Sequence, residues 1–407
     1  MEKFYIFTFL LHFANNLILP FTSLYLYSLN LPVEVIGRFI SILNFSSVFG
    51  FIASIFLSKY KNVSFTIFQI SLFIYGISIL FLFYSKSYIL LFFSILSLSI
   101  SGGIFTLLYQ WFLVSNFKKT KVFSFENLTY AIAYILSTII SGILIKNYGF
   151  NYLIFLLSFS SIIFSLLILS QLKLKIVEEK FEFFISEKFK KFLIIFSLFY
   201  FSVGIASPYF SIFIVRNLNL SALEWSIVGI VEMVSFILFF SSILKIFKKY
   251  STKTLLFFST FLISTIPLFW VITKNYFLIL LYSIISGIAW RIFSIGTYSF
   301  ISKIVKSKFE IGLLSFLSSL FLSLGSLFSS IILHFFPFSS VFYVSFIFRL
   351  FSSFLFLTLK KEKIDLKEIK ENFVLIFKLL KEIFIVFPIK SFHPYNRNNR
   401  IHKSLQK

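Results

Sequence analysis

The chain carries the same short pattern twice, once near its start and once just past its middle. The first copy reads Pro20-Phe21-Thr22-Ser23 and Leu29-Asn30-Leu31-Pro32, and continues to Glu34 and Gly37. The second copy reads Pro208-Tyr209-Phe210-Ser211 and Leu218-Asn219-Leu220-Ser221, and continues to Glu224 and Gly229. In both copies an apolar segment ends just before Leu-Asn-Leu and another begins just after it. A repeat at about half the chain length predicts two similar bundles of membrane helices with a site between them.

The composition around this repeat is that of a protein with many membrane spans. Hydrophobic residues make up 58% of the 407 residues, charged residues make up 13%, and the mean hydropathy is +0.96. A soluble chain of this length needs more charge to cover its surface. We interpret the 65 Phe residues as lipid-facing. The lack of Cys excludes disulfides, thiolate chemistry and Cys-ligated metals.

Twelve apolar segments are long enough to cross a membrane, since a crossing needs about 20 mostly apolar residues. They cover 4–29, 34–57, 63–84, 88–115, 122–146, 151–172, 191–216, 221–247, 253–273, 276–302, 308–334 and 338–359. The loops after even-numbered spans are rich in basic residues, such as Lys118, Lys119 and Lys121, whereas the loops after odd-numbered spans hold one or none. This distribution predicts a multi-pass protein of the cell membrane with both termini in the cytoplasm.

A charged loop divides the spans into two sets of six. We expect an N-terminal six-helix bundle over 1–172, a cytoplasmic linker over 173–190, a C-terminal six-helix bundle over 191–359 and a basic cytoplasmic tail over 360–407. In the tail, the amphipathic stretch 372–387 is interpreted as an interfacial helix rather than a thirteenth span. The net charge of +23 is spread over short loops and the tail, so we expect no nucleic-acid partner.

Local patterns inside the spans strengthen the link between the two halves. Leu31-Pro32 precedes Ile36-Gly37, and Gly102-Gly103 in the fourth span has a counterpart in Ser286-Gly287 of the tenth. With its six-plus-six spans, charged linker and half-chain repeat, the sequence resembles the major facilitator superfamily. The resemblance implies an all-α membrane protein whose twelve transmembrane helices form two pseudo-symmetric six-helix bundles. It also implies that helices 1, 4, 7 and 10 line a central cavity.

Those four spans carry polar side chains at helical spacing. Their serines and glycines serve close helix packing, but packing explains the larger polar residues less well. The candidate substrate-binding residues are Asn15 and Asn16 in span 1, Gln110 in span 4, Tyr200 in span 7, and Trp290 and Arg291 in span 10. His12, on the same face of span 1, is interpreted as a hydrogen-bonded structural residue, with a proton relay as the alternative.

Three charged residues lie deep in the second half of the chain, where an unpaired charge costs at least ~2.5–3.5 kcal/mol. They are Glu232 in span 8, Arg291 in span 10 and Arg349 in span 12. One acid cannot neutralise two arginines, so two pairings stay open. Glu232 either pairs with Arg349 and leaves Arg291 for an anionic or carbonyl-rich substrate, or pairs with Arg291 and serves as a structural ion pair or a proton carrier.

These features predict a secondary transporter that moves a small solute by alternating access, with proton coupling as an option. The alternatives are a flippase for lipids or lipid-linked glycans, and a membrane sensor or scaffold that acts through its basic tail. No metal-ligand spacing, phosphate-binding loop or nucleophile–base pattern stands out, so we expect no enzymatic activity, cofactor or metal. The expected partners are a small-molecule substrate and membrane lipids, and the protein is expected to be a monomer.

Overall fold

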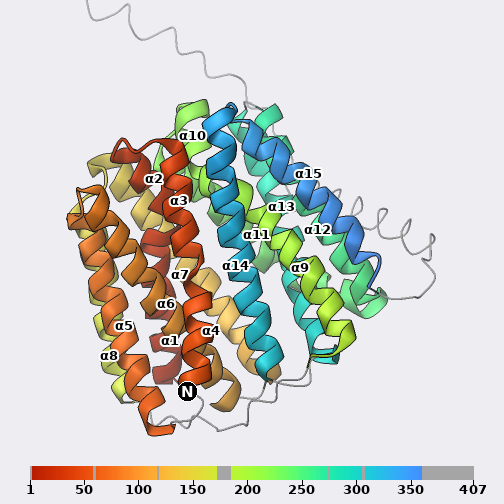
Figure 1. Ribbon diagram of the computed structural model, residues 1–407, viewed down its shortest axis with the longest axis horizontal. Coiled ribbons are helices and arrows are strands. Elements are labelled where there is room, and N and C mark those ends of the chain that lie inside the picture. The colour runs from red at the N-terminus through yellow and green to blue at the C-terminus, as the bar shows by residue number, and fades with distance from the viewer. Residues whose placement is uncertain are drawn as a thin grey trace, which may run out of the picture. The chain divides into compact units, whose positions relative to one another are not determined.

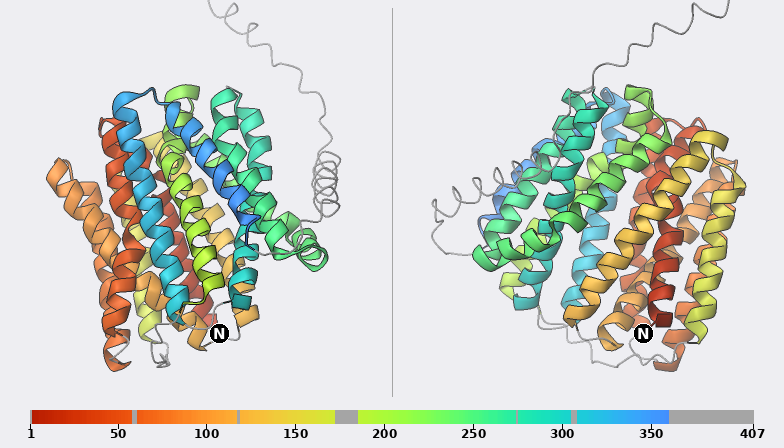
Figure 2. Two further views of the ribbon diagram at one scale, coloured as in Figure 1. Left: turned by 45° about the vertical axis from the view of Figure 1, so that its right-hand side comes forward. Right: turned by 180° about the vertical axis from the view of Figure 1, so that it is seen from behind.

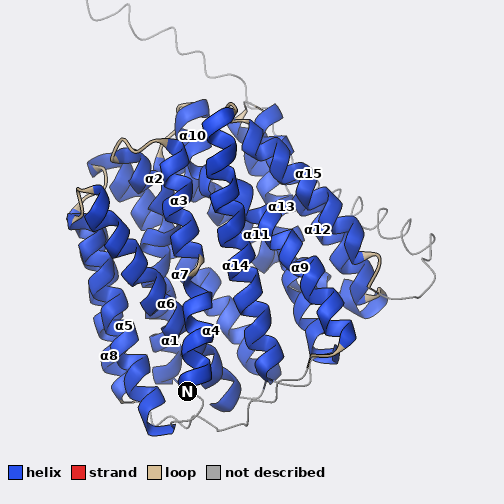
Figure 3. Cartoon of the chain, viewed as in Figure 1, coloured by secondary structure: helices blue, strands red, loops and turns tan. Residues whose placement is uncertain are grey.

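The apolar runs of the sequence form helices, which satisfy their own backbone hydrogen bonds in a membrane that offers no other partners. The computed structural model describes residues 2–57, 61–116, 119–171, 185–273, 275–304 and 308–359. All regular structure in these ranges is helical, and they contain no strand (Figure 3). The predicted tail 360–407 and most of the predicted linker lie outside the described residues.

The helices follow the predicted spans. The first six spans comprise α1 (Glu2–Ile18), the 3-10 turn η1 (Leu19–Phe21), α2 (Thr22–Ser28), α3 (Val33–Asn44), α4 (Ser46–Leu57), α5 (Lys61–Tyr84), α6 (Tyr88–Asn116), α7 (Lys119–Tyr148) and α8 (Tyr152–Ser170). The last six comprise α9 (Glu187–Ala206), the 3-10 turn η2 (Ser207–Tyr209), α10 (Phe210–Leu218), α11 (Ala222–Lys249), α12 (Thr252–Ile272), α13 (Tyr276–Ile304), α14 (Lys308–Phe335) and α15 (Ser340–Phe356).

Within the described residues, eleven helical segments are long and apolar enough to cross a membrane. The twelfth segment, α15, is apolar but has only 17 residues. The predicted all-α fold is therefore confirmed, with a final helix that is shorter than expected. At the other boundary, α9 begins at Glu187 instead of 191, because the Ser186 side chain caps it by accepting the Phe189 N–H.

Prolines break the first and seventh spans. Proline has no N–H, so the carbonyl four residues earlier loses its helical partner. At Pro208 the released carbonyl belongs to Gly204, and it accepts a hydrogen bond from Ser326 Oγ of α14 at 3.1 Å. At Pro20 the proline's own carbonyl accepts the indole N–H of Trp225 from α11 at 2.9 Å. Both breaks therefore provide backbone acceptors for helices elsewhere in the fold.

The repeated Leu-Asn-Leu has a conformational cause. Asn30 and Asn219 both adopt a left-handed backbone conformation, with φ of 59° and 53°. Asparagine tolerates this region better than most residues and commonly ends a helix there. The next helix then starts at once, and in the second copy Ser221 and Glu224 form a capping box at the start of α11.

The helices pack mostly with neighbours from the same half of the sequence. In the first half α1 packs on α7 and α8, and α6 packs on α4 and α5; in the second half α9 packs on α14 and α15, and α13 packs on α11 and α12. The halves meet mainly where α14 packs on α3 and α4 and where α11 packs on α7, with a smaller contact between α2 and α10. Figure 1 shows α14 between α3 and α9, and Figure 2 gives the views from the other sides. We call the end that holds α2 and α10, opposite the N-terminus, the far end.

Hydrogen bonds between polar side chains run along the α3–α14 contact. Ser41 Oγ lies 2.9 Å from Ser323 Oγ, and Asn44 Nδ2 donates to Ser326 Oγ at 3.1 Å. Closer to the far end, Arg38 Nε donates to Ser330 Oγ at 3.2 Å. Small hydroxyl residues let two membrane helices approach closely while they satisfy each other's polar groups.

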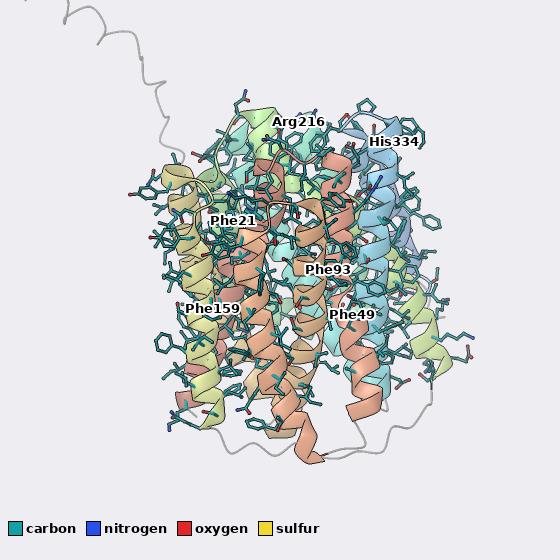
Figure 4. The ribbon with its side chains drawn as sticks, turned by 60° about the vertical axis from the view of Figure 1, so that its left-hand side comes forward. Phe21, Phe49, Phe93, Phe159, Arg216 and His334 are labelled. Carbon is teal, nitrogen blue, oxygen red and sulfur yellow. The ribbon has the colours of Figure 1, made fainter. Side chains whose placement is uncertain are left out.

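The interpretation of phenylalanine as lipid-facing is right for only part of the set. Phe93 is 60% exposed and points outward from α6, whereas Phe21 is fully buried (Figure 4). Eight other phenylalanines rank among the largest fully buried side chains: Phe7, Phe39, Phe68, Phe155, Phe189, Phe192, Phe199 and Phe342. Aromatic rings therefore fill the interior as well as the lipid face.

Candidate functional site

The polar face of α1 is buried and only partly satisfied. Asn15 and Asn16 follow His12 by three and four residues, so both lie on the same side of the helix as His12. Asn16 is 5% exposed. Three buried atoms on this face, His12 Nε2, Asn15 Oδ1 and Asn16 Nδ2, have no hydrogen-bond partner within the described part of the chain.

Tyrosine rings from two other helices surround His12. The ring of Tyr130 on α7 meets the His12 ring edge to face, with centroids 5.1 Å apart. The Tyr109 ring of α6 lies 6.2 Å away in the same geometry, and its hydroxyl donates to Thr8 Oγ1 at 3.3 Å. We name His12, Asn15, Asn16, Tyr109 and Tyr130 the α1 cluster. It combines uncharged polar groups with aromatic edges.

A second group of polar side chains belongs to α11 and α13. The Glu232 carboxylate accepts a hydrogen bond from Ser286 Oγ at 2.6 Å. One turn further along α11, the guanidinium of Arg291 lies over the Phe236 ring, 3.3 Å from its centroid. No ion pair to Glu232 occurs among the described residues. The acid therefore sits beside a neutral hydroxyl in the interior, with Arg291 one helical turn away.

The two groups approach each other through the tyrosines of α7. Tyr130 lies within electrostatic reach of both Arg291 and Glu232, and Tyr134 within reach of Glu232. The Tyr134 hydroxyl packs against the backbone of Gly229 on α11, where a side-chain Cβ would lie 2.4 Å from it. Residues of both sequence halves thus form one buried polar region, composed of the α1 cluster, Glu232, Ser286 and Arg291.

The model of the Major Facilitator Superfamily matches residues 4–309, about three quarters of the chain. The chain belongs to the major facilitator superfamily. It therefore belongs to a family of membrane transporters. No curated protein matches the sequence.

Solved structures of major facilitator transporters share the fold at low sequence identity. A variant of the nucleoside transporter NupG has a TM-score of 0.72 at 15% identity, covering 88% of this chain and 99% of its own. A bacterial homologue of the iron transporter ferroportin, in an inward-facing state, has a TM-score of 0.64 at 16% identity, with 89% and 98% covered. The human organic anion transporter MFSD10 has a TM-score of 0.61 at 12% identity, with 88% and 97% covered.

The remaining candidates from the major facilitator resemblance lie in different surroundings. Tyr200 on α9 stacks near Phe196, with centroids 4.6 Å apart. Trp290 on α13 lies 6.1 Å from the Phe199 ring and 5.9 Å from the Phe293 ring. Both residues border an aromatic cluster between α9 and α13. Gln110 is part of α6, but its side chain lies outside the described residues.

Arg349 lies on α15 between α9 and α12, and only 2% of it is exposed. Its Nη1 donates to the Ile263 carbonyl at 3.3 Å and its Nη2 to the Val203 carbonyl at 3.4 Å. Ile263 precedes Pro267 of α12 by four residues, so its carbonyl is the one that this proline leaves without a helical partner. Among the described residues no carboxylate forms an ion pair with Arg349.

Tyr109, Tyr130 and Tyr134 are residues of this region that sequence reasoning missed. Tyr109 belongs to the fourth span, next to the candidate Gln110, whereas Tyr130 and Tyr134 belong to the fifth span, outside the helices 1, 4, 7 and 10 that the family resemblance indicated. The spacing of four residues between Tyr130 and Tyr134 was the available signal, because it places their two hydroxyls on one face of the helix. No group of three His, Cys, Asp or Glu side chains among the described residues is placed to hold a metal ion.

Proposed function

We propose that this protein is a secondary transporter that moves a small solute by alternating access, with its binding site in the buried polar region shared by α1, α6, α7, α11 and α13. One observation carries the proposal: polar side chains from both sequence halves converge in the interior of an otherwise apolar bundle. Buried polar groups in a membrane protein are costly and are kept where function needs them. A site between two halves can open to either side as they tilt.

The bundles over 1–172 and 191–359 are the two bodies that tilt in this mechanism. We propose that the protein acts as a monomer in the cell membrane with both termini in the cytoplasm, as its lysine distribution favours. Because the chain contains no Cys, a single Cys at Ser28 would report the far end. A membrane-impermeant thiol reagent added to intact cells should label it, and labelling only after lysis would reverse the orientation.

Glu232 is the proposed proton carrier. Its carboxylate is hydrogen-bonded to Ser286 and has no ion pair among the described residues, so it can gain or lose a proton without breaking a salt bridge. A carboxyl group in this setting couples protonation to the direction in which the site faces.

The test uses proteoliposomes with and without an inward-directed proton gradient. Wild-type protein should accumulate its solute when the gradient is present. Glu232→Gln should lose gradient-driven accumulation but retain exchange of internal for external solute, because glutamine preserves the Ser286 hydrogen bond. The control is Glu187→Gln at the exposed start of α9, which should behave as wild type. Undiminished accumulation by Glu232→Gln would exclude this role.

The neighbouring structures do not single out a solute. Their titles name nucleoside, iron and organic anion transporters, which carry chemically unlike cargoes on one fold. The solute class must therefore be inferred from this chain's own side chains. Arg291→Ala provides the first discriminating variant, since an anionic cargo should lose most of its affinity while a neutral cargo should lose less.

A further inference from the structure

The α1 cluster contains three buried hydrogen-bonding atoms that have no partner among the described residues. They are His12 Nε2, Asn15 Oδ1 and Asn16 Nδ2, and they lie within about one helical turn of each other on α1. Leaving a buried polar atom unpaired costs free energy, and native proteins contain few such atoms. Three on a single helix face mark a place where a bound molecule supplies the missing partners.

The chemistry of these atoms specifies that molecule. Asn15 Oδ1 can only accept a hydrogen bond, so its partner must present an N–H or O–H. Asn16 Nδ2 can only donate, so its partner must present an acceptor oxygen or nitrogen. None of the three side chains has to be charged. An ionised carboxylate or phosphate would place acceptor oxygens against the Asn15 oxygen and leave it unpaired.

Aromatic rings limit the shape of the same molecule. Tyr130 and Tyr109 present their rings around His12, with centroids 5.1 and 6.2 Å from the His12 ring. Apolar ring surfaces favour a flat molecule with a low charge. The charged residues of the region, Glu232 and Arg291, belong to α11 and α13.

We propose that the α1 cluster binds the uncharged, hydrogen-bonding part of the transported solute, a group that presents a donor and an acceptor side by side. Two sources share this chemistry: the edge of a cyclic amide in a heterocycle, and neighbouring hydroxyls of a carbohydrate. The inference rests on the proposed transport function and deepens it by naming the solute class.

A thermal-shift experiment measures binding of the solute separately from its transport. Purified protein is heated in the presence of uridine, glucose or benzoate, which represent the cyclic amide, the hydroxyl source and an anion. We expect uridine or glucose to raise the Tm of the wild type and benzoate to leave it unchanged. A shift by uridine alone identifies the heterocycle, and a shift by glucose alone identifies the carbohydrate.

Asn15→Leu and Asn16→Leu keep the side-chain shape and remove the unpaired atoms. Each should leave the ligand-free Tm at or above the wild-type value and weaken binding of the active probe at least tenfold. A role in holding the fold together would instead lower the ligand-free Tm and preserve binding. Asn16→Ala replaces the leucine variant if that one does not fold.

Ser197→Ala is the matched control, because Ser197 Oγ on α9 is also buried without a partner but lies outside the α1 cluster. It should leave binding unchanged.

Uptake of the same probes into proteoliposomes separates the two proposals. Binding without uptake refutes the transport function alone. Uptake that the asparagine variants do not alter, or a shift by benzoate alone or by no probe, overturns the inference about the α1 cluster.

Discussion

At the scale of single residues, Arg349 shows how a buried charge can serve the backbone. It is the largest side chain that is fully buried in the described residues, and its guanidinium bonds to two carbonyl oxygens rather than to an acid. One of these oxygens, on Ile263, lacks a helical partner because of Pro267. The arginine and the proline therefore form a matched pair on α15 and α12.

This pairing predicts a specific double-mutant result. Arg349→Leu should lower the Tm in detergent, because the Ile263 carbonyl then stays buried without a partner, at a cost of about 1–3 kcal/mol. Pro267→Ala restores a backbone N–H four residues after Ile263, so the double variant should recover much of the loss. Additive effects of the two substitutions in the four-member thermal cycle would refute the coupling.

The sequence places Arg349 deep in the membrane and leaves open whether Glu232 pairs with it or with Arg291. Hydropathy reveals depth, since it depends only on neighbouring residues along the chain. It does not reveal which distant carbonyl a guanidinium reaches, and here that carbonyl belongs to another helix. The same limit applies to Tyr130, which meets His12 only because α7 packs on α1.

At the scale of helices, the two copies of the repeat end in glycines with similar surroundings. A Cβ at Gly37 of α3 would lie 2.1 Å from the Tyr209 hydroxyl, and one at Gly229 of α11 would lie 2.4 Å from the Tyr134 hydroxyl. In each case the tyrosine belongs to the other half of the chain. The duplicated glycine thus lies at two contacts between the halves, α3 with η2 and α11 with α7.

Gly37→Ala should push α3 away from η2, since the added methyl group overlaps the Tyr209 hydroxyl. Such overpacking costs about 1–3 kcal/mol, and we expect a lower Tm and slower uptake. Tyr209→Phe removes the hydroxyl and should largely rescue Gly37→Ala, although by itself it loses the hydrogen bond to Ser329 at 3.0 Å. If the double variant is no better than Gly37→Ala alone, this contact does not set the α3–η2 distance.

The bends at Pro20 and Pro208 could be predicted from the sequence because the effect of proline on a helix is local. The left-handed backbone conformations of Asn30 and Asn219 also have a local cause. In the sequence, however, only the repeat of Leu-Asn-Leu pointed to these two positions. The partners of these breaks could not be predicted. Trp225 reaches the Pro20 carbonyl across the junction between the halves, and nothing near Trp225 in the sequence indicates this contact.

At the scale of the whole molecule, alternating access requires the α3–α14 contact to change during transport. The chain contains no Cys, so a Cys pair at Ser41 and Ser323, whose hydroxyls lie 2.9 Å apart, can be crosslinked without background. Oxidation should stop uptake and a reducing agent should restore it. The control pair, Ser78 and Ser97, lies 2.7 Å apart between α5 and α6 of one half, and its crosslink should leave uptake intact. Continued uptake in the oxidised Ser41–Ser323 pair would show that these helices need not separate.

The architecture as a whole was the most predictable level. Twelve apolar runs, a charged linker and a repeat were enough for the fold, because the membrane penalises any other arrangement of such segments. The buried polar region was harder, since five helices contribute to it and the family resemblance indicated only three of them, α1, α6 and α13. Packing between helices decides which polar residues meet, and this packing cannot be predicted from the sequence of any single segment.

The short final helix has a consequence for the lipid around it. With 17 residues, α15 is about 26 Å long, against a hydrocarbon thickness of about 30 Å, and Figure 1 shows that it runs obliquely to α14. Its outer side is apolar, with Ile347 and Phe351 each 59% exposed. A bilayer must therefore thin beside α15 or leave its ends mismatched. We expect uptake to be faster in vesicles of shorter-chain phosphatidylcholine than in longer-chain ones, and equal rates across the series would show that the bilayer adapts to α15 without cost.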